Sequence, residues 1–171
     1  FDPSLLSNEA EVEAKFVVPL FQHLGYPEGC CRLQYPLKIY EPGGRVKNGR
    51  IDQIYFSVTE QKAQDADTSL IIVEAKEPGK TDLEAALAQA SLYGYYLSPL
   101  FLVVTNAHRL LVIKRHRYRG EEQVLDVTLP QLQEQATARR LYRELRFDVV
   151  KHLKAQLADE LTHTLYVDLK H

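Results

Sequence analysis

The chain has 171 residues and a formal net charge of −2, which excludes a polycation that binds nucleic acid with its whole surface. Its length and its hydrophobic fraction of 45% predict one domain, or one domain with a short appendage, that buries a core without disulfide bonds. No apolar run approaches the ~20 residues of a membrane span. The only cysteines, Cys30 and Cys31, are neighbours that complete no zinc pattern, so we expect a reduced, cytoplasmic protein without membrane contact.

The first predicted element is a helix over residues 7–24. Ser7 can cap this helix, Gly25 can end it, and Pro19 should kink it. Its buried stripe consists of apolar side chains that repeat at four-residue steps: Val12, Phe16, Leu20 and Leu24.

Strands are predicted in the next part of the chain. Residues 33–40 form a first strand, residues 41–49 a turn-rich loop, and residues 50–58 a half-buried strand with alternating polarity. A polar loop over residues 60–68 then leads to the central strand at residues 70–76. The apolar start of that strand is typical of a strand buried on both faces of a sheet.

A second helix is predicted to begin at Thr81, where Thr81 and Glu84 match a capping box. It is followed by an apolar strand over residues 101–105 and by another strand over residues 109–115. Because apolar strands flank this helix, we expect a right-handed crossover between neighbouring parallel strands of a sheet covered on both faces.

The pattern after Pro130 is helical. The sequence therefore predicts an α/β fold with three α/β/α layers around a central mixed sheet. We expect residues 1–128 to form the main domain and residues 129–171 to form a C-terminal helical extension packed on it.

The central strand ends on two opposite charges, Glu74 and Lys76, which point to the same face of the sheet. They lie at the carboxyl end of the strand, where open α/β sheets place ligands. Antiparallel pairing with residues 50–58 would set Asp52 beside Glu74. Two carboxylates can hold Mg²⁺, and a lysine can orient an attacking water, so a phosphodiester is the substrate that suits this group. The alternative is a surface ion pair between Glu74 and Lys76.

Five motifs occur along the chain in an order that resembles a known family. They are NEAEVEAKFVVPLFQHLGYP in the first helix, GRID, LIIVEAKEPG, QASLY and LFLVVTNAHRLLVI. Together they resemble the PD-(D/E)xK nuclease superfamily, and in particular the N-terminal nuclease domain of type I restriction enzyme R subunits. The resemblance implies a restriction-endonuclease-like core and a Mg²⁺-dependent endonuclease acting on DNA, with Mn²⁺ as a substitute.

The resemblance also implies roles for individual residues. Asp52, Glu74 and the Ala75 carbonyl would bind the metal, together with Glu9 from the first helix, and Lys76 would position the water. Gln89 and Tyr93, four residues apart on one helix face, would line the site. The motif does not decide among Glu9, Glu11 and Glu13, and Glu9 is the preferred choice. Packing under the sheet is the alternative for Tyr93, and solvent exposure is the alternative for Gln89.

Basic residues supply candidate contacts to DNA: Arg50, Lys114, Arg115 and Arg117. No base-reading motif and no phosphate-binding loop of an ATP-driven motor is present. Expected partners beyond DNA are therefore a specificity or modification subunit, or a motor domain outside this chain. The alternative function is a catalytically inactive nuclease-fold module for DNA binding or complex assembly. The choice between DNA and RNA stays open.

Overall fold

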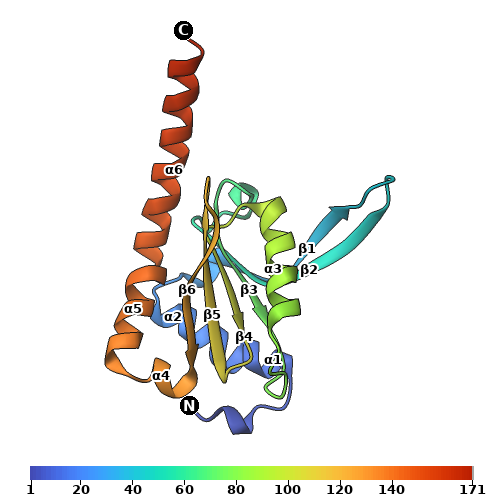
Figure 1. The fold of residues 1–171 in the computed structure, drawn as a ribbon, viewed down its shortest axis with the longest axis vertical. Helices are drawn as coiled ribbons and strands as arrows, with labels where there is room; N and C mark the ends of the chain where they lie inside the picture. The colour runs from blue at the N-terminus through green and yellow to red at the C-terminus, as the bar shows by residue number, and fades with distance from the viewer. Residues whose placement is uncertain (171) are drawn as a thin grey trace.

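One mixed sheet organises the molecule (Figure 1). The computed structural model describes residues 1–170, without the side chains of residues 164–168. Within that part the sheet has six strands in the order β1-β2-β3-β4-β5-β6, and neighbours are antiparallel except β3 and β4, which are parallel. The strands are β1 (Cys31–Tyr40), β2 (Val46–Phe56), β3 (Ser69–Ala75), β4 (Phe101–Thr105), β5 (Arg109–His116) and β6 (Gly120–Thr128).

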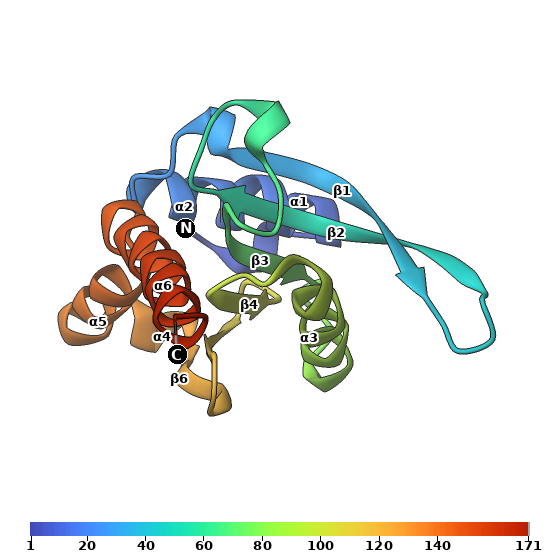
Figure 2. The ribbon, with the colours of Figure 1, turned by 90° about the horizontal axis from the view of Figure 1, so that it is seen from above.

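Helices cover both faces of this sheet, which confirms the predicted three-layer architecture (Figures 1 and 2). Helix α3 (Glu84–Leu97) connects the parallel strands β3 and β4 and buries its apolar side chains on one face. The N-terminal helical segment and the C-terminal helices share a second apolar cluster on the other face. The remaining helical elements are η1 (Pro3–Leu5), α1 (Glu9–Val12), η2 (Glu13–Val17), α2 (Val18–His23), η3 (Glu28–Cys30), η4 (Gln61–Ala63), α4 (Leu129–Leu132), α5 (Gln135–Leu145) and α6 (Phe147–Asp168). Among the described residues, no helix combines the length and the apolar character needed to cross a membrane.

The predicted first helix is the continuous run α1–η2–α2, in which η2 is a π-helical segment. Asn8, rather than Ser7, caps it, because the Asn8 side chain accepts a hydrogen bond from the Glu11 backbone. The irregularity expected from Pro19 takes the form of this π segment, where the Val18 N–H donates to the Glu13 carbonyl five residues earlier. The helix therefore continues through Pro19 to His23.

Two strand predictions are incomplete. The loop expected at residues 41–49 is confined to residues 41–45, because β2 begins at Val46 and pairs with β1 as far as Tyr40. The two strands thus form a long hairpin that projects away from the helices (Figures 1 and 2). Strand β6 has no counterpart in the sequence prediction, because its Glu121, Glu122 and Gln123 are exposed polar residues at a sheet edge.

The expected capping box of α3 does not form. The helix begins at Glu84, with Leu83 in the cap position and no side-chain cap. Instead, the Asp82 carboxylate accepts a hydrogen bond from the Glu84 N–H at 2.9 Å. Residues 76–83, which include a turn, separate the central strand from the helix.

The C-terminal helices pack on the sheet rather than standing apart from it. Leu141, Leu145 and Val150 are buried in the same cluster as the apolar side chains of β3 and β4. The Lys154 amine donates to the carbonyls of Ala66 at 3.0 Å and Ser98 at 2.7 Å, which ties α6 to the core. Leu157 of α6 still packs against this cluster, and the C-terminal end of the helix extends away from the sheet (Figure 1). The division of the chain at residues 128 and 129 stays a prediction.

Candidate active site

The register of β2 and β3 brings the two predicted carboxylates together. Gln53 pairs with Val73, so the preceding residue of β2, Asp52, lies opposite Glu74 at the end of β3. The Asp52 carboxylate accepts a hydrogen bond from the Ala75 N–H at 2.8 Å. This side-chain bond takes the place of a backbone hydrogen bond at the end of the β2–β3 ladder. It holds Asp52 beside the turn that follows β3.

Glu74 is completely buried, and neither oxygen of its carboxyl group has a hydrogen-bond partner among the described residues. Its nearest cation is Lys76, with 3.8 Å between Nζ and Oε2. Burial, followed by the neighbouring charge of Asp52, raises the pKa of Glu74 to about 9, although Lys76 acts in the opposite direction. A buried carboxyl group without donors is costly, so this position is suited to binding a cation.

Lys76 lies one residue beyond β3, where its backbone N–H still donates to the Thr105 carbonyl at 2.8 Å. Its amine lies 3.5 Å from a carboxylate oxygen of Glu9, in addition to its contact with Glu74. Lys76 therefore joins the first helix to the end of the central strand. Glu9 lies more than 60 residues before Glu74 and Lys76 in the sequence, so only the fold brings it to the end of the central strand.

The first helix presents two of its three acids to this site. Carboxylate oxygens of Glu9, Glu13 and Asp52 lie within 4.8 Å of one another. Glu11 turns away, since its carboxylate accepts hydrogen bonds from Ser7 at 2.7 Å and from Lys15 at 2.6 Å. The structure thus places Glu9 at this site, which is the acid preferred from the sequence, and it places Glu13 there as well. Glu13 follows Glu9 by four residues, a spacing that puts both on one helix face and could have indicated it.

The surroundings of Glu13 are unusual. Burial and the charge of Asp52 raise the pKa of Glu13, while the amides of Gln53 and Gln34 lower it. Gln34 has a φ of 51° and interrupts the β1–β2 ladder directly opposite Asp52. A left-handed glutamine in a strand is strained, and such strain is concentrated at functional sites. Nothing in the local sequence pattern indicated Gln34 or Gln53.

Gln89 and Tyr93 approach from α3, and the Gln89 amide donates to the Tyr93 hydroxyl at 2.8 Å. The Tyr93 ring is buried in the cluster under α3 and rests against the backbone of Gly49. A Cβ at Gly49 would lie 3.0 Å from the ring and 2.9 Å from Ile39 Cδ1. The glycine therefore permits the close approach that sets the position of Tyr93, and through it that of Gln89.

Glu9, Asp52, Lys76, Gln89 and Tyr93 border one cleft of about 670 Å³, whereas Glu13 and the fully buried Glu74 are not among its lining residues. The hairpin forms one wall and α3 the opposite one, while Asp52 and Lys76 lie between them. The cleft is lined by Glu9, Gln34, Ile39, Lys47, Asn48, Gly49, Arg50, Asp52, Lys76, Ala88, Gln89, Leu92 and Tyr93.

Only one of the four predicted DNA contacts borders the cleft, among the residues that the structure describes. Arg50 lines it. Lys114 pairs with Phe101 at the start of β4, whereas Glu74 lies opposite Val104 near its end, so Lys114 lies at the other end of the sheet.

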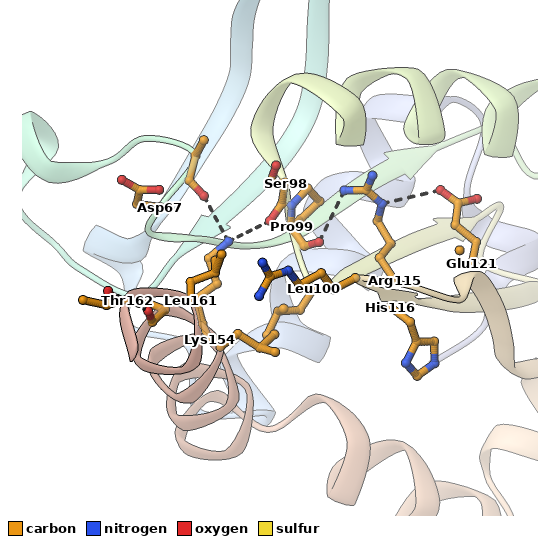
Figure 3. A pocket seen from close by; sticks show the side chains of 15 residues that line it. Asp67, Ser98, Pro99, Leu100, Arg115, His116, Glu121, Lys154, Leu161 and Thr162 are labelled. Atoms are coloured by element: carbon orange, nitrogen blue, oxygen red, sulfur yellow. Dashed lines mark hydrogen bonds and ion pairs between the residues drawn. The ribbon is translucent and has the colours of Figure 1, made fainter. Parts of the chain in front are cut away.

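The two arginines that follow Lys114 lie at that far end as well, at a separate cavity of about 830 Å³ (Figure 3). Arg115 is engaged internally, with its guanidinium 2.7 Å from the Gly94 carbonyl and 3.5 Å from Glu121. Arg117 lies over the Tyr118 ring, 4.9 Å from its centroid. Lys114, Arg115 and Arg117 are close together in the sequence, but in the structure they lie away from the carboxylates of Asp52 and Glu74.

Comparisons with known proteins agree with this fold. Residues 8–130 match the family model described as the N terminus of the type I restriction enzyme R protein. The chain is similar to a structure described as a fragment of an HsdR subunit of a type I restriction enzyme from Vibrio vulnificus YJ016, with 19% identity and a TM-score of 0.51. The match covers 80% of this chain and 26% of that one. A structure of a DrdV–DNA complex matches with 20% identity and a TM-score of 0.48, over 82% of this chain and 12% of that one. No curated protein matches the chain.

Proposed function

Because this chain belongs to the family of type I restriction enzyme R protein N termini, we propose that it is a Mg²⁺-dependent nuclease domain that hydrolyses DNA phosphodiester bonds. One observation carries the proposal. The buried, unpartnered carboxyl group of Glu74 lies beside Asp52 and within 3.8 Å of the Lys76 amine. A purely structural ion pair would not leave both oxygens of Glu74 without a donor.

The donor set fits Mg²⁺, because it consists of hard oxygen ligands and includes the Glu74 carboxyl group, which has no hydrogen-bond donor among the described residues. Asp52, Glu74 and the Ala75 carbonyl would hold the ion, with Glu9 and Glu13 completing the acidic side. A bound Mg²⁺ would lower the pKa of a coordinated water and neutralise charge on a phosphate. Mn²⁺, which accepts the same ligands, would substitute for it.

The protein's own groups have separate tasks in this proposal. Lys76 balances the acidic cluster before the substrate binds, as its contact with Glu9 indicates, and then orients a water and stabilises negative charge on the phosphate. Gln89 and Tyr93 hold the substrate backbone against the cleft wall. Since the sequence contains no base-reading motif, selection of a DNA sequence would come from a specificity subunit or a motor domain outside this chain.

A plasmid-nicking assay with Mg²⁺ or Mn²⁺ tests the proposal. Lys76→Ala and Glu74→Gln should each lower the rate of nicking by about 10²–10³-fold, the usual effect of removing one charge-stabilising group. Lys80→Ala, which removes an exposed lysine four residues further on, should nick at the wild-type rate.

Two results would contradict the proposal. Nicking by Lys76→Ala at the wild-type rate would show that the site is not catalytic. DNA binding without nicking by the wild-type protein in either metal would instead support the alternative of an inactive DNA-binding module.

A further inference from the structure

The β1–β2 hairpin borders the cleft, and its turn projects away from the helices (Figures 1 and 2). Its base is held to α3, where the Tyr40 backbone N–H donates to the Tyr96 hydroxyl at 3.1 Å and Ile39 packs beside Tyr93. Beyond that base, all residues from 40 to 48 are exposed. This outer part of the hairpin, which includes its turn, therefore contributes little to the core and is available to a partner.

The hairpin carries an excess of positive charge that the protein does not neutralise. Residues 38–50 contain four basic residues, Lys38, Arg45, Lys47 and Arg50, and a single acid, Glu41. None of the four forms an ion pair within the described part of the chain, and all four are exposed. By contrast, Arg109, Arg115 and Arg146 each have an acidic partner. The hairpin, which borders the cleft, therefore presents four basic side chains without an acidic partner.

The basic surface is continuous with the candidate active site. Lys47 and Arg50 line the same cleft as Asp52 and Lys76. Arg50 lies two residues before Asp52 on β2, so it is close to the carboxylates along the strand. Lys38, which pairs with Asn48, adds a third cation at the same level of the hairpin, and Arg45 carries the charge outward to the turn.

We propose that the β1–β2 hairpin is an arm that binds the phosphate backbone of duplex DNA and leads it into the cleft. This inference rests on the proposed function. Lys47 and Arg50 are three residues apart, or about 10 Å along a strand, which corresponds to about three phosphate intervals along the axis of one DNA strand. Although their side chains alternate across the strand, both border the cleft, so Lys47 and Arg50 can contact different phosphates of the duplex. Lys38 lies beside Asn48, between these two positions, and Arg45, nearer the turn, contacts a phosphate further from the cleft.

Fluorescence anisotropy with a labelled duplex of about 20 base pairs, in EDTA so that no cleavage occurs, tests the arm. The double variant Lys47→Ala/Arg50→Ala should bind at least about tenfold more weakly near 100 mM NaCl than the wild type. Its salt dependence, the slope of log K against log[NaCl], should fall by about two units, one for each lost phosphate contact. A second double variant of the arm, Lys38→Ala/Arg45→Ala, should show the same change in slope.

Arg139→Ala/Arg140→Ala is the matched control, because it removes the same charge from exposed positions of α5 on the other side of the sheet. Its affinity and slope should stay within about twofold of the wild type. Two results would overturn the proposal that the hairpin binds DNA while leaving the nuclease proposal intact. One is an equal loss of DNA affinity in the control, and the other is a wild-type slope in both arm variants with unchanged melting temperatures. Failure of the wild-type protein to bind any duplex would overturn both.

Discussion

At the scale of single residues, Glu74 differs most from an ordinary surface acid. Its ionised form has lost its water without gaining a hydrogen-bond donor among the described residues, and it lies beside the charge of Asp52. Without a metal the protonated form is therefore favoured up to a pKa of about 9, compared with a usual value of 4.5.

This difference predicts how stability depends on pH in metal-free buffer. The folded protein holds the Glu74 proton between pH 4.5 and about 9, whereas the unfolded chain releases it. The free energy of unfolding should therefore be highest below that window and fall as the pH rises through it, by at most about 1.4 kcal/mol per pH unit. Glu74→Gln, which resembles the neutral acid, should remove this slope in urea titrations at pH 5, 7 and 9. A variant that kept the wild-type slope would assign the pH dependence to other groups.

Gly49 gives a second prediction for a single residue. The new methyl group of Gly49→Ala would meet Ile39 at 2.9 Å and the Tyr93 ring at 3.0 Å, so one of them must move. We expect a loss of about 1–3 kcal/mol in the free energy of unfolding from overpacking, together with slower nicking because Tyr93 holds Gln89. Gly79→Ala serves as the control, since no atom lies within 4 Å of its added Cβ. Similar losses in both variants would indicate that the contact with Tyr93 is unimportant.

At the scale of elements, the acids of the first helix look alike in the sequence but have different partners in the structure. Glu11 stabilises the start of the helix, and Lys15 and Ser7 lower the pKa of Glu11 to about 2. Glu9 and Glu13 face Asp52 instead. The π segment that begins at Glu13 lies at this boundary, in keeping with the frequent occurrence of π segments near functional sites.

We therefore expect Glu13→Gln to weaken Mn²⁺ binding by about tenfold or more, as loss of a metal-supporting group commonly does. Glu11→Gln removes the same charge two residues away and should leave Mn²⁺ affinity unchanged. Calorimetric titration of both variants with Mn²⁺ measures the difference. Equal affinities for the two would place Glu13 outside the metal site.

At the scale of the whole molecule, the C-terminal helices complete the core of the sheet. Leu145 and Val150 are fully buried against it, and Lys154 donates to carbonyls at the end of α3 and in the loop before β3. Burial lowers the pKa of the Lys154 amine to about 8, against a usual value of 10.5. The amine is thus placed to satisfy carbonyl groups at the C-terminal end of α3, where cations are stabilising.

Lys154→Ala should lower the free energy of unfolding by about 1–3 kcal/mol, because it leaves the Ser98 and Ala66 carbonyls without their donor. His152→Ala, at an exposed position of the same helix, should change it by less than about 0.5 kcal/mol. Urea unfolding of both variants supplies the comparison. A negligible effect at Lys154 would mean that apolar packing alone holds α6 to the core.

Much of this architecture follows from local patterns. The apolar runs of β3 and β4 are recognisable because both faces of these strands are covered, and helix periodicity identifies the helices. The pairing of Asp52 with Glu74 follows from the same reasoning, because adjacent antiparallel strands bring the start of one beside the end of the other. Strand β6 was not predicted, because the first half of this edge strand is exposed and polar and therefore lacks the alternating apolar pattern of a half-buried strand.

The sequence by itself determined the types of the elements except β6, the three-layer arrangement and the motifs that identify the family, since apolar patterns and motifs are each read from residues close together in the chain. Only the tertiary structure decided that Glu13 and Gln34 join the site, that Glu11 leaves it, and that Arg115 lies at the far end of the sheet. These outcomes depend on where the first helix crosses the sheet and on the interruption of the β1–β2 ladder at Gln34. Such contacts join residues that are far apart in the chain. The spacing of residues within either segment therefore does not give the distance between their side chains.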